Sequence, residues 1–174
     1  MKQGNKQYGF TIVELLIVVV VIAILAAITI VSYTGIQNRA NDTAVQNDLR
    51  NLGMKLREYY TLNNDAYPIN GSTTASVPGF DLVGLTKTAY ASGINNVYYC
   101  TASINGAKEF GLAARSKSGN TWKYTSMAGM GVYTGSWGSS GGACNGADIP
   151  TTSAGFEYKY GVTSSGVWNA WIQP

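Results

Sequence analysis

The sequence has 174 residues with 12 basic and 9 acidic side chains, so its formal net charge is only +3. This near balance argues against an electrostatic nucleic-acid surface, and the length fits one modest domain with an accessory segment. Histidine is absent, which excludes histidine-dependent nucleophile sites and histidine-bearing zinc sites. We therefore expect no catalytic set, no metal site and no cofactor.

The chain begins with a short, polar and basic segment that gives way abruptly to a long apolar run. Lys2 and Lys6 lie within residues 1–9, whereas residues 15–28 are all apolar. A helix over residues 10–31 would be about 33 Å long, which is enough to cross the hydrocarbon core of a membrane. The lysines predict that the leading segment stays on the cytoplasmic side.

Three ordinary interpretations of this apolar run are possible: a secretory signal, a buried core helix and a membrane anchor. A secretory signal is disfavoured because the run exceeds a normal signal core and no Ala-x-Ala site follows it. A buried core helix is disfavoured because the run is apolar on every face and the protein is small. A plain single-pass anchor fits the length and the lysines. It leaves Glu14 without a role, although a carboxylate so near the end of the run can reach the interface.

The residues Gly-Phe-Thr-Ile-Val-Glu-Leu-Leu at positions 9–16 resemble the class III signal of type IV pilins and pseudopilins. The resemblance covers residues 1–35 and includes the basic leader, the glycine, the phenylalanine, the glutamate and the apolar run. In that family a membrane aspartyl protease, the prepilin peptidase, cuts after the glycine and N-methylates the new first residue. The resemblance implies cleavage between Gly9 and Phe10, methylation of Phe10, and Glu14 as the fifth mature residue.

Such a cut would create a positively charged amine at Phe10, four residues before Glu14. In a helical stack, the amine of one subunit can meet the carboxylate of a neighbour. This pairing offsets the cost of burying each charge and fixes the axial register. We therefore expect Phe10 and Glu14 to be the subunit-assembly residues, and the uncut, lysine-bearing leader to prevent assembly.

One departure from the family concerns helix breakers. Many relatives carry a glycine and a proline within the apolar helix, where the segment can unwind on assembly. Here the first proline is Pro68, and Gly35 is the glycine nearest the apolar run inside the helix. We predict that the hydrophobic helix stays continuous in the filament, which an unwound stretch at residues 23–32 would contradict.

Beyond the apolar run, apolar residues recur at steps of four and three, which predicts an amphipathic helix packed on a sheet. This stripe consists of Val45, Leu49, Leu52, Leu56 and Tyr59. Only Gly35 stands between the two patterns, so we predict one helix over residues 10–62. The helix is expected to end before Asn63 and Pro68.

The rest of the chain alternates β-type runs with turn residues after an irregular connection over residues 64–95 that holds a short helical turn at 81–85. Strands are predicted at residues 96–103, 109–115, 121–126, 155–162 and 167–172, with a long glycine-rich loop at 126–150. The fold class is therefore α+β: a long N-terminal helix, half hydrophobic and half amphipathic, packed on an antiparallel sheet as a pilin-like lollipop. We divide the chain into a leader 1–9, a membrane and filament-core helix 10–35, and a head 36–174.

The two cysteines, Cys100 and Cys144, are expected to form a disulfide, because an even pair in an exported chain meets an oxidising compartment. The alternative is two unconnected buried thiols. The bridge would stabilise the head by about 3–4 kcal/mol and pin the glycine-rich loop to the first strand.

We interpret the many aromatic residues of the head as cross-strand packing rather than an adhesive surface. Asp148 alone offers too few oxygens for a calcium site.

The resemblance implies a structural role as a type IV pilus subunit that supports motility, adhesion or DNA uptake. The implied partners are further copies of the chain, the prepilin peptidase, a platform membrane protein and a cytoplasmic ATPase. The precursor would lie in the cytoplasmic membrane with its head outside, and the assembled filament would be extracellular. The alternatives are a secretion-system pseudopilin or a membrane-anchored extracellular binding module with an uncut leader. An exported enzyme is least favoured, because the acidic residues Asp81, Glu109, Asp148 and Glu157 are scattered.

Overall fold

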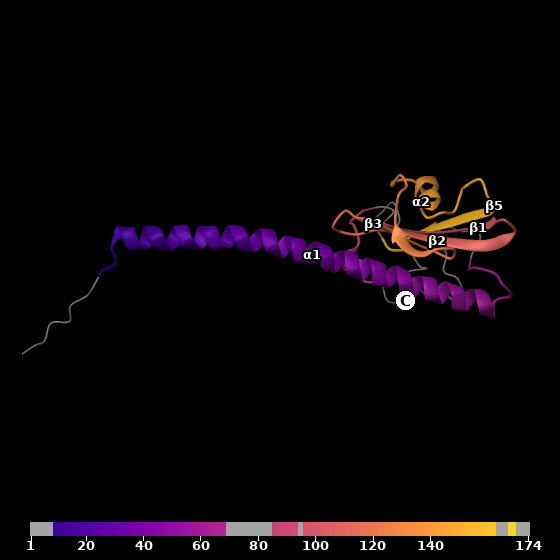
Figure 1. The fold of residues 1–174 in the computed structure, drawn as a ribbon, viewed down its shortest axis with the longest axis horizontal. Coiled ribbons are helices and arrows are strands. Elements are labelled where there is room, and N and C mark those ends of the chain that lie inside the picture. Colours follow the sequence, from indigo (N-terminus) through magenta and orange to yellow (C-terminus); the bar gives the residue numbers. More distant parts are fainter. Residues whose placement is uncertain (1–8, 69–84, 94–95, 163–166, 170–174) are drawn as a thin grey trace, which may run out of the picture. The chain divides into compact units, whose positions relative to one another are not determined.

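The computed structural model describes residues 9–68, 85–93, 96–162 and 167–169. The chain forms two compact units, Met1–Gln37 and Asn38–Pro174. One helix, α1 (Ile12–Leu62), contributes to both (Figure 1). It is followed in the described chain by a 3-10 turn η1 (Lys87–Ala89), β1 (Val97–Ile104), β2 (Ala107–Arg115), β3 (Thr121–Thr125), β4 (Gly129–Val132), α2 (Ser140–Gly146) and β5 (Ala154–Tyr160).

α1 is 51 residues long and confirms the predicted single helix. Its first part belongs to the first unit and exposes apolar side chains around its whole circumference; Ile12 is 81% and Val21 is 48% exposed. Within the described chain, α1 is the helix that is long and apolar enough, by length and composition, to cross a membrane. An exposed apolar surface of this extent requires lipid or another protein chain to cover it.

The second unit contains a five-stranded sheet in the order β4-β3-β2-β1-β5. Every neighbouring pair of strands is antiparallel. Asn105 and Gly106 join β1 to β2, with φ angles of 52° and 83°. An Asn-Gly pair adopts this left-handed backbone readily, and the resulting turn matches the twist of a tight hairpin. With α1, the sheet confirms the predicted α+β fold.

One face of the sheet packs on the amphipathic part of α1. The first four residues of the predicted stripe, Val45, Leu49, Leu52 and Leu56, are at most 3% exposed. They share a core cluster with Tyr99 of β1 and with Phe110 and Leu112 of β2. Because successive strand residues point to opposite faces, alternate residues of β1 and β2 meet the helix. This contact is what holds the second part of α1 against the sheet.

Gly53 sets how closely α1 approaches the sheet. A Cβ atom at this position would lie 2.1 Å from the ring of Tyr124 on β3. We predict that Gly53→Ala lowers the free energy of unfolding by about 1–3 kcal/mol, the usual cost of overpacking. Gly35→Ala is the matched control, because Gly35 lies in the same helix and a Cβ atom added there would meet nothing within 4 Å. Denaturant unfolding of the detergent-solubilised chain checks both variants, and equal stability would contradict the prediction.

Two elements lie in the region that the sequence predicts as a loop. β4 adds an edge strand beside β3, with Met130 opposite Tyr124. α2 is a short helix capped by Ser139, whose hydroxyl accepts a hydrogen bond from the backbone of Gly142 at 3.1 Å. The prediction of an irregular region over residues 126–150 is therefore wrong for these two segments, since glycine-rich sequences carry little helix or strand propensity.

The four predicted strands at residues 96–103, 109–115, 121–126 and 155–162 correspond to β1, β2, β3 and β5. The fifth, at 167–172, reaches residues outside the described part of the chain. Its described portion shows an isolated bridge between Val162 and Trp168. Most of the predicted turn at 81–85 also lies outside the described residues, and the nearest described turn is η1.

Candidate functional site

The predicted cleavage bond lies just ahead of α1. Gly9 and Phe10 are exposed and outside regular secondary structure, and α1 begins at Ile12. The Phe10 side chain is 87% exposed. A peptide bond in this position is not locked in a helical hydrogen-bond ladder, so it is sterically open to a protease.

Glu14 lies in the first turn of α1 and folds back onto Thr11. Its Oε2 atom accepts hydrogen bonds from the backbone nitrogen of Thr11 at 2.9 Å and from the Thr11 hydroxyl at 2.7 Å. The Glu14 backbone nitrogen donates in return to the Thr11 hydroxyl oxygen at 3.3 Å. This reciprocal arrangement is a capping box, which satisfies two helix donors at once. Sequence reasoning singled out Glu14 but missed Thr11, although Thr-x-x-Glu before an apolar run is the known signal.

The predicted disulfide is present and lies on the face of the sheet away from α1. Cys100 of β1 and Cys144 of α2 are joined at an S–S distance of 2.01 Å. Both are fully buried in a second core cluster with Tyr98, Ala113 and Ile149. The bridge therefore fixes α2 to the middle of the sheet, as expected for the region around Cys144.

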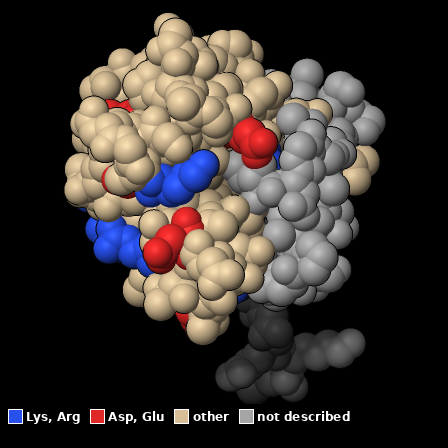
Figure 2. All heavy atoms as spheres, turned by 90° about the vertical axis from the view of Figure 1, so that its right-hand side faces the viewer, with Lys and Arg blue, Asp and Glu red and all other residues tan. Residues whose placement is uncertain are grey.

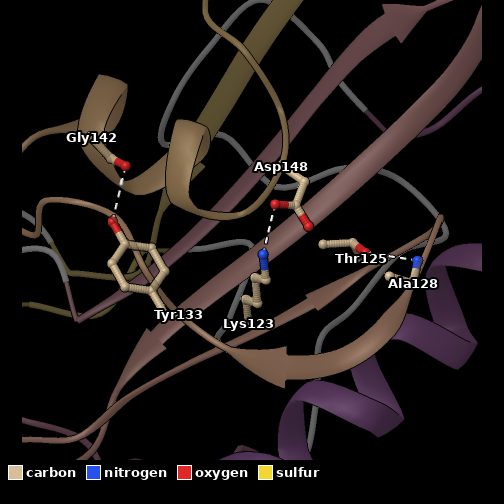
Figure 3. A network of polar contacts seen from close by, with 6 residues as sticks. All are labelled: Lys123, Thr125, Ala128, Tyr133, Gly142 and Asp148. Carbon is tan, nitrogen blue, oxygen red and sulfur yellow. Dashed lines mark hydrogen bonds and ion pairs between the residues drawn. The ribbon is translucent and has the colours of Figure 1, made fainter.

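Two glycines of this region, Gly135 and Gly146, leave room for the side chain of Tyr133. The Tyr133 hydroxyl lies 2.9 Å from the carbonyl oxygens of both Ser136 and Gly142, and Figure 3 shows its ring turned toward α2. A Cβ atom on Gly146 would come within 2.3 Å of the ring, and one on Gly135 within 2.6 Å of the hydroxyl. Gly135 and Gly146 thus have a packing cause, which sequence reasoning did not identify.

The carboxylate of Asp148 forms an ion pair with a lysine. Its Oδ1 atom lies 2.6 Å from Nζ of Lys123 on β3, an ion pair shown in Figure 3. The pair ties the segment after α2 to the sheet. Nearby, the backbone nitrogen of Ala128 donates to the Thr125 hydroxyl at 3.0 Å and shapes the β3–β4 turn. These contacts support a structural role for the region.

Charged side chains are sparse on the face of the molecule shown in Figure 2, where basic and acidic groups are interspersed among other residues. A nucleic-acid surface would gather lysine and arginine on one face. No broad basic patch is visible among the described residues of this view.

Asp48 is a buried carboxylate, 5% exposed, that joins α1 to the η1 segment. It accepts hydrogen bonds from the backbone nitrogen of Thr86 at 2.7 Å and from the Tyr90 hydroxyl at 3.0 Å. Burial raises the pKa of Asp48, and the hydrogen bonds from Thr86 and Tyr90 oppose this shift only in part. The carboxyl group therefore binds its proton more tightly in the folded head than in the unfolded chain.

This shift makes stability depend on pH. A raised folded pKa gives stability that is present below the ordinary value of 3.8 and declines as the pH rises through the folded pKa. We predict that Asp48→Asn reduces the change in unfolding free energy between about pH 4 and about pH 7. Asp65→Asn, a change at an exposed carboxylate just after α1, is the control. An unchanged pH profile in Asp48→Asn would contradict the assignment.

Comparison with known families and proteins gives a consistent set of matches. Residues 4–30 match the family model described as a prokaryotic N-terminal methylation motif. The chain is 34% identical to the type IV wide pilus major component PilA4 of Thermus thermophilus, over 72% of this chain and 85% of that protein. It is 32% identical to the type IV major pilin protein PilE1 of Neisseria gonorrhoeae, over 67% of this chain and 74% of that protein.

A second group of relatives matches a shorter stretch. The type II secretion system core protein G of Pseudomonas aeruginosa is 35% identical over 38% of this chain and 46% of its own length. No solved structure gave a significant match. The likeness to the two pilus proteins therefore extends well into the second unit, whereas this secretion protein matches less than half of the chain.

Proposed function

Because this chain belongs to the type IV pilin family and is a structural subunit of a pilus, we propose that it is cut between Gly9 and Phe10, methylated at Phe10 and polymerised through its N-terminal helix. The observation that carries the proposal is the register of the first residues. A glycine and a phenylalanine stand exposed ahead of α1, with a glutamate in its first turn. The methylation-motif match covers this same segment.

The exposed apolar part of α1 supports polymerisation. Its side chains require a cover that the described residues of this chain do not supply. Lipid covers them in the precursor, and other copies of the helix cover them in the filament. Transfer of this helix from lipid to the filament interior costs little hydrophobic free energy, because both surroundings are apolar. Helix packing and charge pairing therefore decide whether the subunit assembles. Glu14 supplies the charge, and its counterpart is the new amine at Phe10 of a neighbouring copy.

The extent of the similarity favours a pilus over a secretion pseudopilus. The pilin relatives match 72% and 67% of the chain, whereas the Pseudomonas secretion protein matches 38%. Membership of the pilin family implies three further partners, which are the prepilin peptidase, a platform membrane protein and a cytoplasmic ATPase. The precursor then resides in the cytoplasmic membrane with its head outside, and the assembled form is an extracellular filament.

Intact-mass and N-terminal measurement of protein sheared from the cell surface tests the proposal. We expect a chain that starts at methylated Phe10 and is lighter by the hydrogens lost in the Cys100–Cys144 bond. A chain that still starts at Met1, or one found only in membranes, would overturn the proposal. That result would favour a membrane-anchored binding module.

A further inference from the structure

The turn between β2 and β3, residues 116–120, is held against α1 at Asp42. The Asp42 carboxylate accepts hydrogen bonds from the Ser118 hydroxyl and from the Asn120 side-chain amide, the second at 2.8 Å. Further along α1, Arg57 donates to a carbonyl oxygen just after β3, at the opposite end of that strand, at 2.9 Å. The second unit begins at position 38. The turn therefore lies at the end of this unit where α1 enters it.

This end of the second unit is basic. Arg39, Arg115 and Lys117 are all exposed, and none of them forms an ion pair with another described residue. The backbone nitrogens of Arg115 and Lys117 donate to main-chain carbonyls of neighbouring segments, at 2.9 Å and 2.8 Å. Their positions are therefore fixed by the fold. Asp42 is the acidic residue in hydrogen-bond contact with the turn, so positive charge prevails. We call Arg39, Arg115 and Lys117 the basic end.

The other end of the sheet has mixed charge. The turn at Asn105 and Gly106 lies there, because successive hairpins of an antiparallel sheet turn at opposite ends. Glu58 belongs to the last part of α1, Asp65 follows that helix, and Glu109 lies near the start of β2. Figure 2 looks onto the side of the molecule where α1 ends, and it shows basic and acidic groups interspersed. Positive charge is thus concentrated where the chain leads to its apolar segment.

Spacing along α1 brings the basic end to the level of lipid headgroups. Tyr33 is 64% exposed and follows the apolar run, which ends at Val31. Tyrosine is enriched at the membrane–water interface. Arg39 is six residues beyond Tyr33 in the same helix, or about 9 Å. The headgroup layer is about 5–8 Å thick on each side, and charges act over about 10 Å at 0.1 M salt. The basic end is therefore within reach of lipid phosphates when residues 10–31 span the membrane.

We propose that the basic end docks on anionic phospholipid headgroups and holds the head on the membrane surface before assembly. The inference rests on the proposed function in one respect, which is that the precursor spans the membrane with its head outside. Each lysine or arginine near an anionic surface favours docking roughly fivefold. Because α1 already tethers the head beside the bilayer, this modest attraction is enough to order it. Asp42 contributes by fixing the lysine-bearing turn at the right level.

The full-length chain in lipid nanodiscs tests the proposal. One set of discs contains phosphatidylcholine alone, the other adds phosphatidylglycerol, and both carry a small amount of gadolinium-chelating lipid. Paramagnetic relaxation of backbone amides in NMR spectra then reports how near each amide lies to the headgroups. We expect faster relaxation of the amides of residues 117–120 in the anionic discs, and equally slow relaxation of Asn105 and Gly106 in both. About 1 M salt should abolish the difference, because it shortens the Debye length to about 3 Å.

Charge variants identify the side chains responsible. Arg115→Gln with Lys117→Gln should lower the ratio of docked to free heads in the anionic discs roughly 25-fold. Lys108→Gln is the matched control, because Lys108 is exposed near the start of β2, at the other end of the sheet, and this variant should dock as the wild type does.

Equal relaxation of the wild-type turn in both kinds of disc would overturn the proposal, as would a double variant that responds to phosphatidylglycerol like the wild type. If that double variant kept its lipid response but gave few sheared filaments, the basic end would instead meet another copy of the chain. Failure of membrane insertion shows separately, because the amides around Tyr33 would then be unaffected by the gadolinium lipid in either disc.

Discussion

Replacing both cysteines, as Cys100→Ser with Cys144→Ser, is expected to lower the free energy of unfolding by about 3–4 kcal/mol. The bridge spans 44 positions of sequence, so the unfolded chain gains considerable freedom without it. α2 has only 7 residues and cannot persist alone, because helices this short are unstable in water. Its loss would also uncover Tyr98 and Ala113, which pack beneath it. Denaturant unfolding of the detergent-solubilised chain measures the effect.

Reduction supplies the matched control for this experiment. A reducing agent should lower the stability of the wild-type protein to that of the double variant and should leave the variant itself unchanged. A double variant as stable as the oxidised wild type would show that the Cys100–Cys144 bond does not hold α2 in place.

Glu14→Gln is expected to stop assembly without affecting leader removal. Neutral glutamine leaves the neighbour's Phe10 amine as an unpaired buried charge. Breaking a buried pair costs about 3–5 kcal/mol, which corresponds to a loss of assembled filament of roughly a hundredfold or more. The amount of protein sheared from cells, compared with the processed chain in membranes, measures this loss.

The control for Glu14 makes the same kind of change at an exposed carboxylate of the head. Asp65→Asn lies just beyond the end of α1 and should assemble as the wild type does. If Glu14→Gln also assembled normally, a charge pair between Glu14 and Phe10 could not be what fixes the register of the subunits.

The long helix and most strands could be predicted because their patterns are strong and local. The stripe from Val45 to Leu56 has helical spacing, and its members are buried as expected. β1 and β2 stand on either side of an Asn-Gly turn. The cysteine pair was predicted from the export context, and the structure joins the two residues.

Features that depend on tertiary contact could not be predicted in the same way. α2 and β4 are rich in glycine, and three glycines of this region, Gly135, Gly142 and Gly146, lie where an added Cβ atom would clash with its surroundings. Gly146, for example, leaves room for the ring of Tyr133, which lies just after β4 in the chain. The ion pair between Asp148 and Lys123 forms only because the segment after α2 folds back against the sheet. Thr11 is the exception, because the Thr-x-x-Glu spacing signals its contact with Glu14 in the sequence itself.

The most direct test of polymerisation through the N-terminal helix is a helical reconstruction of filaments sheared from the cell surface by cryo-electron microscopy. We predict that α1 is continuous through residues 23–32 and packs on the same segment of other copies, with the Glu14 carboxylate within about 4 Å of a neighbour's Phe10 amine. Filaments in which copies touch only through their heads, with residues 10–35 making no contact with other copies, would contradict the account.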